Sequence, residues 1–209
     1  MDLIINHVRI NIVLLLFVLY HNMSTRRSLP LFVFSLSLLS LPAIETSAAT
    51  NFLTYLNPVQ GIKMQYPSNW TVSQNGLRDF SDVAGFFAPF GNISDVFPGR
   101  LILSIRHYSE NVTLNEYNNL VNSSLRQPTV QITESSPSTL AGNPAHKIVF
   151  LASPGIAPFK IETMLVWMVR GNNVYTISFN SEPEKFPTYV PTVEKMINSF
   201  ELTNQTGTK

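Results

Sequence analysis

The side chains that could do chemistry in this sequence are few and widely spaced. Beyond residue 50 there are only two histidines, His107 and His146. A transition-metal site needs neighbouring imidazole or carboxylate ligands, and Glu110 is the acid nearest to His107. His107 with Glu110 is therefore a candidate pair of metal ligands. Each histidine alternates with apolar residues, so the simpler interpretation places both at the edge of a core.

The segment from Asp79 through Asp82 to Asp95 is a second candidate for holding an ion. Calcium takes about six to eight oxygen ligands, and this is the only acid-bearing segment long enough to curl round it. The segment lacks the Asp-X-Asp-X-Asp-Gly spacing of a helix-loop-helix calcium site. Calcium is therefore an expectation from acid content alone, and a solvated loop is the simpler interpretation.

The same segment carries aromatic side chains that could contact a partner. Phe86 or Phe87 must face the core of the strand that contains them, whereas Phe90 and Phe97 lie beyond that strand. Aromatic side chains left outside a core are typical of protein-binding surfaces. Phe90 and Phe97 are therefore the predicted docking residues.

The chain contains none of the short motifs that mark α/β-hydrolases, P-loop proteins, dinucleotide-binding folds or zinc peptidases. We assign no catalytic residue, and a binding module without enzymatic activity is the favoured interpretation. The alternative is a secreted hydrolase with a dispersed site of serine, histidine and acid, because such triads are recognised by geometry and not by sequence position.

Strands are the main elements that must position these residues. Ile62, Met64 and Tyr66 alternate with polar residues before Pro67, the period-two pattern of a half-buried strand. Gly171-Asn172-Asn173 has the composition of a tight hairpin turn. Further strands are predicted at 84–88, 101–108, 130–134, 145–152, 159–170, 174–180 and 200–202.

Two helices are predicted among the strands. Thr113 and Glu116 form a capping box at the start of the first helix. The second carries apolar residues at helical spacing from Tyr189 to Ile197 and should begin near Thr188, so that Pro191 falls in its first turn. The order of elements predicts an α+β fold, with helices covering an antiparallel sheet.

Composition excludes several classes of protein. The chain has 209 residues and no Cys, which rules out disulfides, thiol nucleophiles and cysteine-bound metals. Beyond residue 49 it has 11 basic and 11 acidic residues. A nucleic-acid-binding protein needs an excess of basic residues, so nucleic acid is not an expected partner.

Residues 1–49 are predicted to be a targeting segment, and residues 50–209 one domain. Arg26 and Arg27 precede an apolar run from Leu29 to Leu41, and small residues follow up to Ala49. This is the order of a signal peptide, with cleavage expected after Ala49 and a possible true start at Met23. The alternative is retention of the apolar run as an anchor. Sequons typical of exported proteins occur at Asn69, Asn92, Asn111, Asn122 and Asn204.

The domain resembles the PsbP family, whose namesake is an extrinsic subunit of photosystem II. The resemblance rests on five segments in order, and it is closer to prokaryotic PsbP-like proteins than to the plant subunit. The segments are 61–67 with Asn69-Trp70, 83–89, Thr113-Leu114 with Glu116-Tyr117, 140–145, and Val174-Tyr175 with 196–200.

The resemblance implies an αβα sandwich around an antiparallel sheet and an extracytoplasmic location. It also implies a non-enzymatic accessory role, with peripheral docking on a membrane protein complex or binding of a small ligand or ion. Some relatives are linked to calcium retention, which agrees with the calcium expectation from the segment with Asp79, Asp82 and Asp95. A photosynthetic role does not follow, because the leader does not resemble a plastid transit peptide.

Overall fold

The computed structural model describes residues 51–74, 80–91, 98–153 and 159–203. The predicted signal segment, its cleavage site and Asn204 lie outside these ranges. Within them, no helix is long and apolar enough to cross a membrane.

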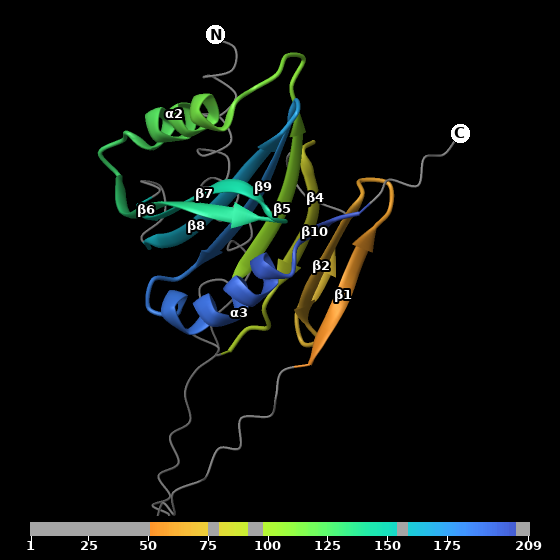
Figure 1. Cartoon of the computed structure of the whole chain (residues 1–209). Coiled ribbons are helices and arrows are strands. Elements are labelled where there is room, and N and C mark those ends of the chain that lie inside the picture. Colours follow the sequence, from red (N-terminus) through yellow and green to blue (C-terminus); the bar gives the residue numbers. More distant parts are fainter. Residues whose placement is uncertain (1–50, 75–79, 92–97, 154–158, 204–209) are drawn as a thin grey trace, which may run out of the picture.

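Ten strands and two helices make up the described chain (Figure 1). Their bounds are β1 Phe52–Asn57, β2 Ile62–Pro67, β3 Thr71–Ser73, β4 Asp82–Phe87, β5 Arg100–His107, α2 Leu114–Leu125, β6 Val130–Leu140, β7 Asn143–Ala152, β8 Ile161–Arg170, β9 Asn173–Ser181, α3 Phe186–Asn198 and β10 Glu201–Leu202.

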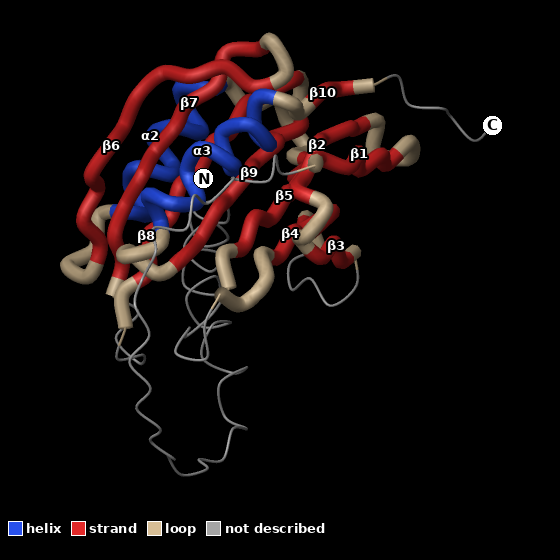
Figure 2. Tube along the Cα trace, turned by 90° about the horizontal axis from the view of Figure 1, so that it is seen from below, coloured by secondary structure: helices blue, strands red, loops and turns tan. Residues whose placement is uncertain are grey.

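The strands form two antiparallel sheets. The larger has the order β3-β4-β5-β9-β8-β7-β6, and the smaller has the order β1-β2-β10. Figure 2 shows the small sheet at one side of the molecule and β6 at the other. The α+β class and the helices on both faces of an antiparallel sheet are thus confirmed, and the second sheet is an addition to the prediction.

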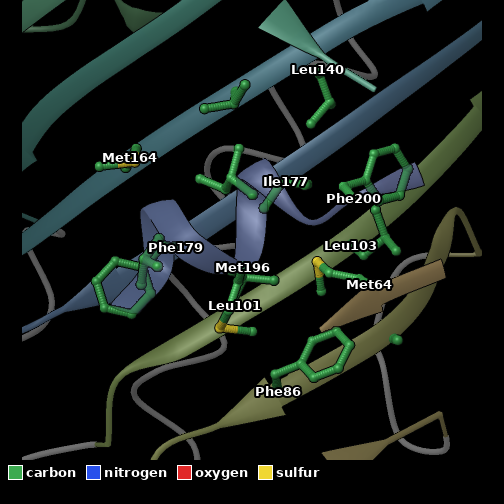
Figure 3. Close-up of a cluster of buried hydrophobic side chains, with 14 of the residues drawn as sticks. Met64, Phe86, Leu101, Leu103, Leu140, Met164, Ile177, Phe179, Met196 and Phe200 are labelled. Atoms are coloured by element: carbon green, nitrogen blue, oxygen red, sulfur yellow. The ribbon is translucent and has the colours of Figure 1, made fainter. Parts of the chain in front are cut away.

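Two apolar clusters lie on opposite faces of the large sheet. The larger cluster joins that sheet to α3 and the small sheet, and it contains Met64, Phe86, Leu103, Ile177 and Met196 (Figure 3). The smaller cluster lies under α2 and is centred on Trp167, whose side chain is fully buried. Alternate residues of β8 belong to the two clusters, which is why this strand is apolar along almost its whole length.

Both helices begin close to the predicted positions. Thr113 caps α2, accepting from the Glu116 N–H at 3.2 Å, while the Glu116 carboxylate accepts from the Thr113 N–H at 2.8 Å. Helix α3 begins two residues before the predicted start, at Phe186, so Pro191 lies inside the helix and not in its first turn. The prediction was wrong here because Pro187 already occupies the start of the helix, where a missing N–H costs nothing.

Three strands also differ from the prediction. Strands β1 and β3 were not predicted, and β6 extends to Leu140 instead of ending at Glu134. In β6 a register shift between Ile132 and Glu134 interrupts the period-two pattern. The strand continues beyond this bulge through a polar stretch that has no apolar alternation to mark it.

Candidate functional site

His107 lies at the exposed end of β5, beside the turn that joins β8 to β9. Its Nδ1 is 3.0 Å from Oδ1 of Asn173, and its Nε2 is 3.2 Å from Nδ2 of Asn172. Both ring nitrogens are therefore engaged by side-chain amides, and no contact joins His107 to Glu110 within the described chain. The expected position at a core edge is wrong for His107, because the strand ends there and the ring reaches the surface.

The structure separates Asp82 from His107. Asp82 is opposite Ser104, whose hydroxyl donates to Asp82 Oδ1 at 2.7 Å, so it is three positions along β5 from His107. Three positions correspond to about 10 Å, and an odd separation places the two side chains on opposite faces of the sheet. These two residues cannot ligate one ion.

No group of three or more His, Cys, Asp or Glu side chains is gathered for a metal ion within the ranges that the structure describes. Asp79 and Asp95 lie outside those ranges. Calcium binding by the segment with Asp79, Asp82 and Asp95 therefore stays a prediction, as does any role of Glu110.

His146 lies at the edge of the cluster under α2, as its alternation with apolar residues predicts. Its ring packs against Trp167 with centroids 5.2 Å apart, and its Nε2 is 2.9 Å from Oγ of Ser135 on β6. Burial lowers the pKa of the imidazole. The pair of hydroxyl and imidazole resembles two members of a hydrolytic triad, but no described carboxylate contacts His146 to orient it.

Phe90 is exposed, as predicted for a docking residue. Its side chain is 59% exposed, whereas Phe86 is fully buried on the preceding strand. The backbone between them is held in place, because the Ala88 N–H donates to the Gly99 carbonyl at 2.8 Å. Phe97, the second predicted docking residue, lies outside the described residues.

Most of the exposed large apolar side chains of the described chain lie on β1 with the turn after it, or at the two opposite ends of β4. Leu53, Leu56, Val59, Phe80 and Phe90 belong to β1, the turn after it and the flanks of β4, while Ile132 alone is on β6. Sequence reasoning missed the β1 group because it missed the strand. Leu53, Leu56 and Val59 share one strand and its turn, and exposed apolar residues that lie together are typical of interaction sites.

A pocket of about 420 Å³ lies where the two sheets meet, lined by Ala141, Asn143, Arg170, Glu201 and Leu202. Arg170 and Glu201 give it one charge of each sign, although Glu201 also pairs with Lys63 at 2.8 Å. No sequence-predicted site residue lines this pocket.

Three predicted sequons fall within the described chain. Asn69 and Asn111 are exposed, and Asn122 on α2 is half-buried. Asn92 and Asn204 lie outside the described residues. Exposure is necessary for glycosylation, so modification of Asn69 and Asn111 stays a prediction that their positions permit.

Comparison with known proteins identifies the family and the fold. Residues 40–202 match the model of a family described as PsbP-like protein. No curated protein matches the chain. Two solved structures with similar folds are cyanobacterial PsbP (CyanoP) from Synechocystis sp. PCC 6803 and the Ran-binding protein Mog1p from Saccharomyces cerevisiae.

The likeness to both structures extends over most of each chain. The CyanoP match has a TM-score of 0.52 and 10% identity, and covers 78% of this chain and 98% of CyanoP. The Mog1p match has a TM-score of 0.51 and 9% identity, and covers 75% of this chain and 97% of Mog1p. Such low identities show a shared fold and nothing about shared partners.

Proposed function

We propose that this chain, which belongs to the PsbP-like protein family, is an exported accessory module without enzymatic activity that docks on a membrane-associated protein complex. The family membership supports an accessory role. One protein of similar fold, Mog1p, is by its name a Ran-binding protein, so the fold is compatible with protein recognition. Export is proposed from the leader, with its basic pair, apolar run and small residues before Ala49.

The exposure of Phe90 is the observation that carries the docking proposal. The ring is 59% exposed, two residues beyond the hydrogen bond from the Ala88 N–H to the Gly99 carbonyl. Residues 83–91 contain no charged side chain. An aromatic side chain has only two side-chain torsions, so its ordering on binding costs little conformational entropy. On an uncharged segment it suits the centre of an interface with an apolar protein surface.

The test is site-specific photo-cross-linking in cells that express the whole chain. A photoreactive phenylalanine analogue replaces Phe90, and in a matched control it replaces Ile132, which is 42% exposed on β6 at the opposite side of the molecule. We expect Phe90 to give a reproducible cross-link to a membrane protein and Ile132 to give none. Equal labelling from both positions, or none from Phe90, would contradict the proposal.

A secreted hydrolase is the second candidate, and the contact between Ser135 and His146 is the observation in its favour. No carboxylate among the described residues contacts His146, and this weakens the hydrolase proposal, because the acid of a triad orients the imidazole and stabilises its charged form. Assay of the purified chain on simple esters separates the two functions. Turnover that Ser135→Ala and His146→Ala both abolish would favour the hydrolase over the accessory module.

A further inference from the structure

The edges of the two sheets differ in how well they are protected against pairing with another strand. Natural proteins protect edge strands by making them short or by placing charges, proline or bulges in them. Edge strands β3 and β10 have only three and two residues. Edge strand β6 carries Glu134, Pro137 and a register shift.

Edge strand β1 has none of these protections. It has six residues, pairs with β2 in an unbroken register from Phe52↔Pro67 to Asn57↔Ile62, and contains neither proline nor charge. Leu53 and Leu56 on it are 48% and 57% exposed. Both views show β1 at the side of the molecule away from β6, in the small sheet (Figures 1 and 2). Among the described edges, β1 is the one built to accept another strand.

Hydrogen bonds on β2 show which backbone groups of β1 are available. The Gln65 N–H donates to Ser199 Oγ at 2.8 Å, so it points away from β1. Gln65 is opposite Thr54. In an antiparallel pair, the backbone N–H and C=O groups of two facing residues either all point toward the other strand or all point away from it. The N–H and C=O of Thr54 therefore point to the free edge, as do those of Phe52 and Leu56 two residues away.

We propose that β1 pairs with β1 of a second copy of this chain, in antiparallel orientation. The outward-pointing backbone groups of the two strands pair when a twofold axis passes beside Thr54. Thr54 then lies opposite Thr54 of the second copy. Phe52 then faces Leu56 of the second copy, and the reverse pair forms as well. Each of these facing pairs exchanges two backbone hydrogen bonds, and the aromatic–aliphatic contacts add to the stability of the pairing.

Charge and exposure favour a second copy as the occupant. Residues 51–62 contain no charged side chain, and the chain beyond residue 49 has equal numbers of basic and acidic residues. Identical surfaces can then meet without like-charge repulsion. Pairing also covers part of Leu53 and Leu56. Because two six-residue strands bury less than a standard interface of about 1,600 Å², the dimer is weak and forms at high local concentration.

Cysteine cross-linking tests the pairing and its register, because the chain has no cysteine of its own. Facing residues in a hydrogen-bonded antiparallel pair have Cα atoms about 5.5 Å apart, within the range of a disulfide. Thr54→Cys should therefore give a covalent dimer on mild oxidation of the full chain in its native compartment. Leu53→Cys tests the register, since Leu53 faces Tyr55 of the second copy and not Leu53. Thr139→Cys is the control for cross-linking by chance, because it places an exposed thiol on β6.

We expect strong cross-linking from Thr54→Cys and only traces from Leu53→Cys and Thr139→Cys. A monomeric Thr54→Cys protein, or equal cross-linking from all three variants, would overturn the proposal. This result is separate from docking through Phe90, because none of the three substitutions alters that residue.

Sedimentation of the otherwise unaltered chain provides a second readout. Its average mass should rise with concentration from the mass of one copy towards the mass of two. Thr54→Pro removes an N–H that β2 does not use, so it should keep the unfolding midpoint and remain monomeric. Leu56→Lys, with a charge on the edge, should do the same. Dimers that form equally well in both variants, or a constant monomer in the parent, would overturn the proposal.

Discussion

The indole of Trp167 donates its Nε1 hydrogen to Oδ1 of Asn118 at 2.9 Å, which ties α2 to the middle of β8. The Trp167 side chain is fully buried and also contacts Tyr117 and His146. A buried indole N–H without a partner costs about 1–3 kcal/mol. We therefore expect Asn118→Ala to lower the free energy of unfolding by about that amount in urea titrations. Asn119→Ala, at an exposed neighbouring position, should change it by less than about 0.5 kcal/mol.

A second buried polar pair lies between β8 and β9. The Thr163 hydroxyl donates to Oδ1 of Asn180 at 2.9 Å, and both residues are 1% exposed. Nδ2 of Asn180 has no hydrogen-bond partner among the residues that the structure describes. Thr163→Val should destabilise by about 1–3 kcal/mol, because it leaves the amide fully unsatisfied. Adding Asn180→Leu to Thr163→Val should recover most of the lost free energy of unfolding. A double variant that is less stable than Thr163→Val would contradict this reading of the pair.

The turn between β6 and β7 stores backbone strain. Ala141 and Gly142 have φ values of 48° and 72°, the conformation of a two-residue type I′ turn. An alanine in the left-handed region costs about 1–2 kcal/mol, whereas asparagine is favoured there. Ala141→Asn should raise the free energy of unfolding by about 0.5–1 kcal/mol. Gly142→Ala should lower it, and the opposite signs of the two changes are the control.

Stability should fall between neutral and mildly acidic pH through His146. Burial lowers the pKa of His146 below its ordinary value of 6.5. The unfolded chain then binds a proton more readily than the folded chain, so the contribution is complete above pH 6.5 and is lost as the pH falls through the folded pKa. Unfolding titrations at several pH values should show a smaller loss in His146→Gln than in the unaltered chain. An equal loss would assign the dependence to other groups.

Titration of the tyrosine hydroxyl groups tests the burial of Tyr108, which packs against the cluster under α2. Burial raises the pKa of Tyr108 to about 12; the nearby Tyr117 adds to the shift and Arg106 opposes it. Ultraviolet titration should show a late ionisation step near pH 12, and Tyr108→Phe should remove that step. A late step that persists in this variant would place it elsewhere.

Local signals explain why much of the fold could be predicted. The capping box of Thr113 and Glu116 and the turn at Gly171 depend on residues near one another in the chain, and both formed as expected. Strand β1 was missed because an edge strand leaves both Leu53 and Leu56 exposed. Apolar residues then occur on both of its faces, and the period-two pattern disappears.

The candidate site was harder to predict, because its contacts depend on strand register. The contact between Ser135 and His146 is diagonal across β6 and β7, where Ser135 faces Ile148 and His146 faces Pro137. The two-residue turn after Leu140 sets that register, which runs unbroken from Leu140↔Asn143 to Glu134↔Val149. The spacing of Ser135 and His146 in the sequence gives no sign of the contact. Phe90 could be predicted because it follows a strand whose core-facing Phe86 fixes the side of the chain that remains outside.

Membrane retention of the Phe90→Ser protein is the most direct test of the central claim. The full chain is expressed, membranes are washed and sedimented, and the bound fraction is measured beside that of Ile132→Ser. We expect Phe90→Ser to be released while Ile132→Ser remains bound like the unaltered chain, with equal unfolding midpoints for both variants. Retention of Phe90→Ser at the parental level, or equal release of both variants, would contradict docking through Phe90.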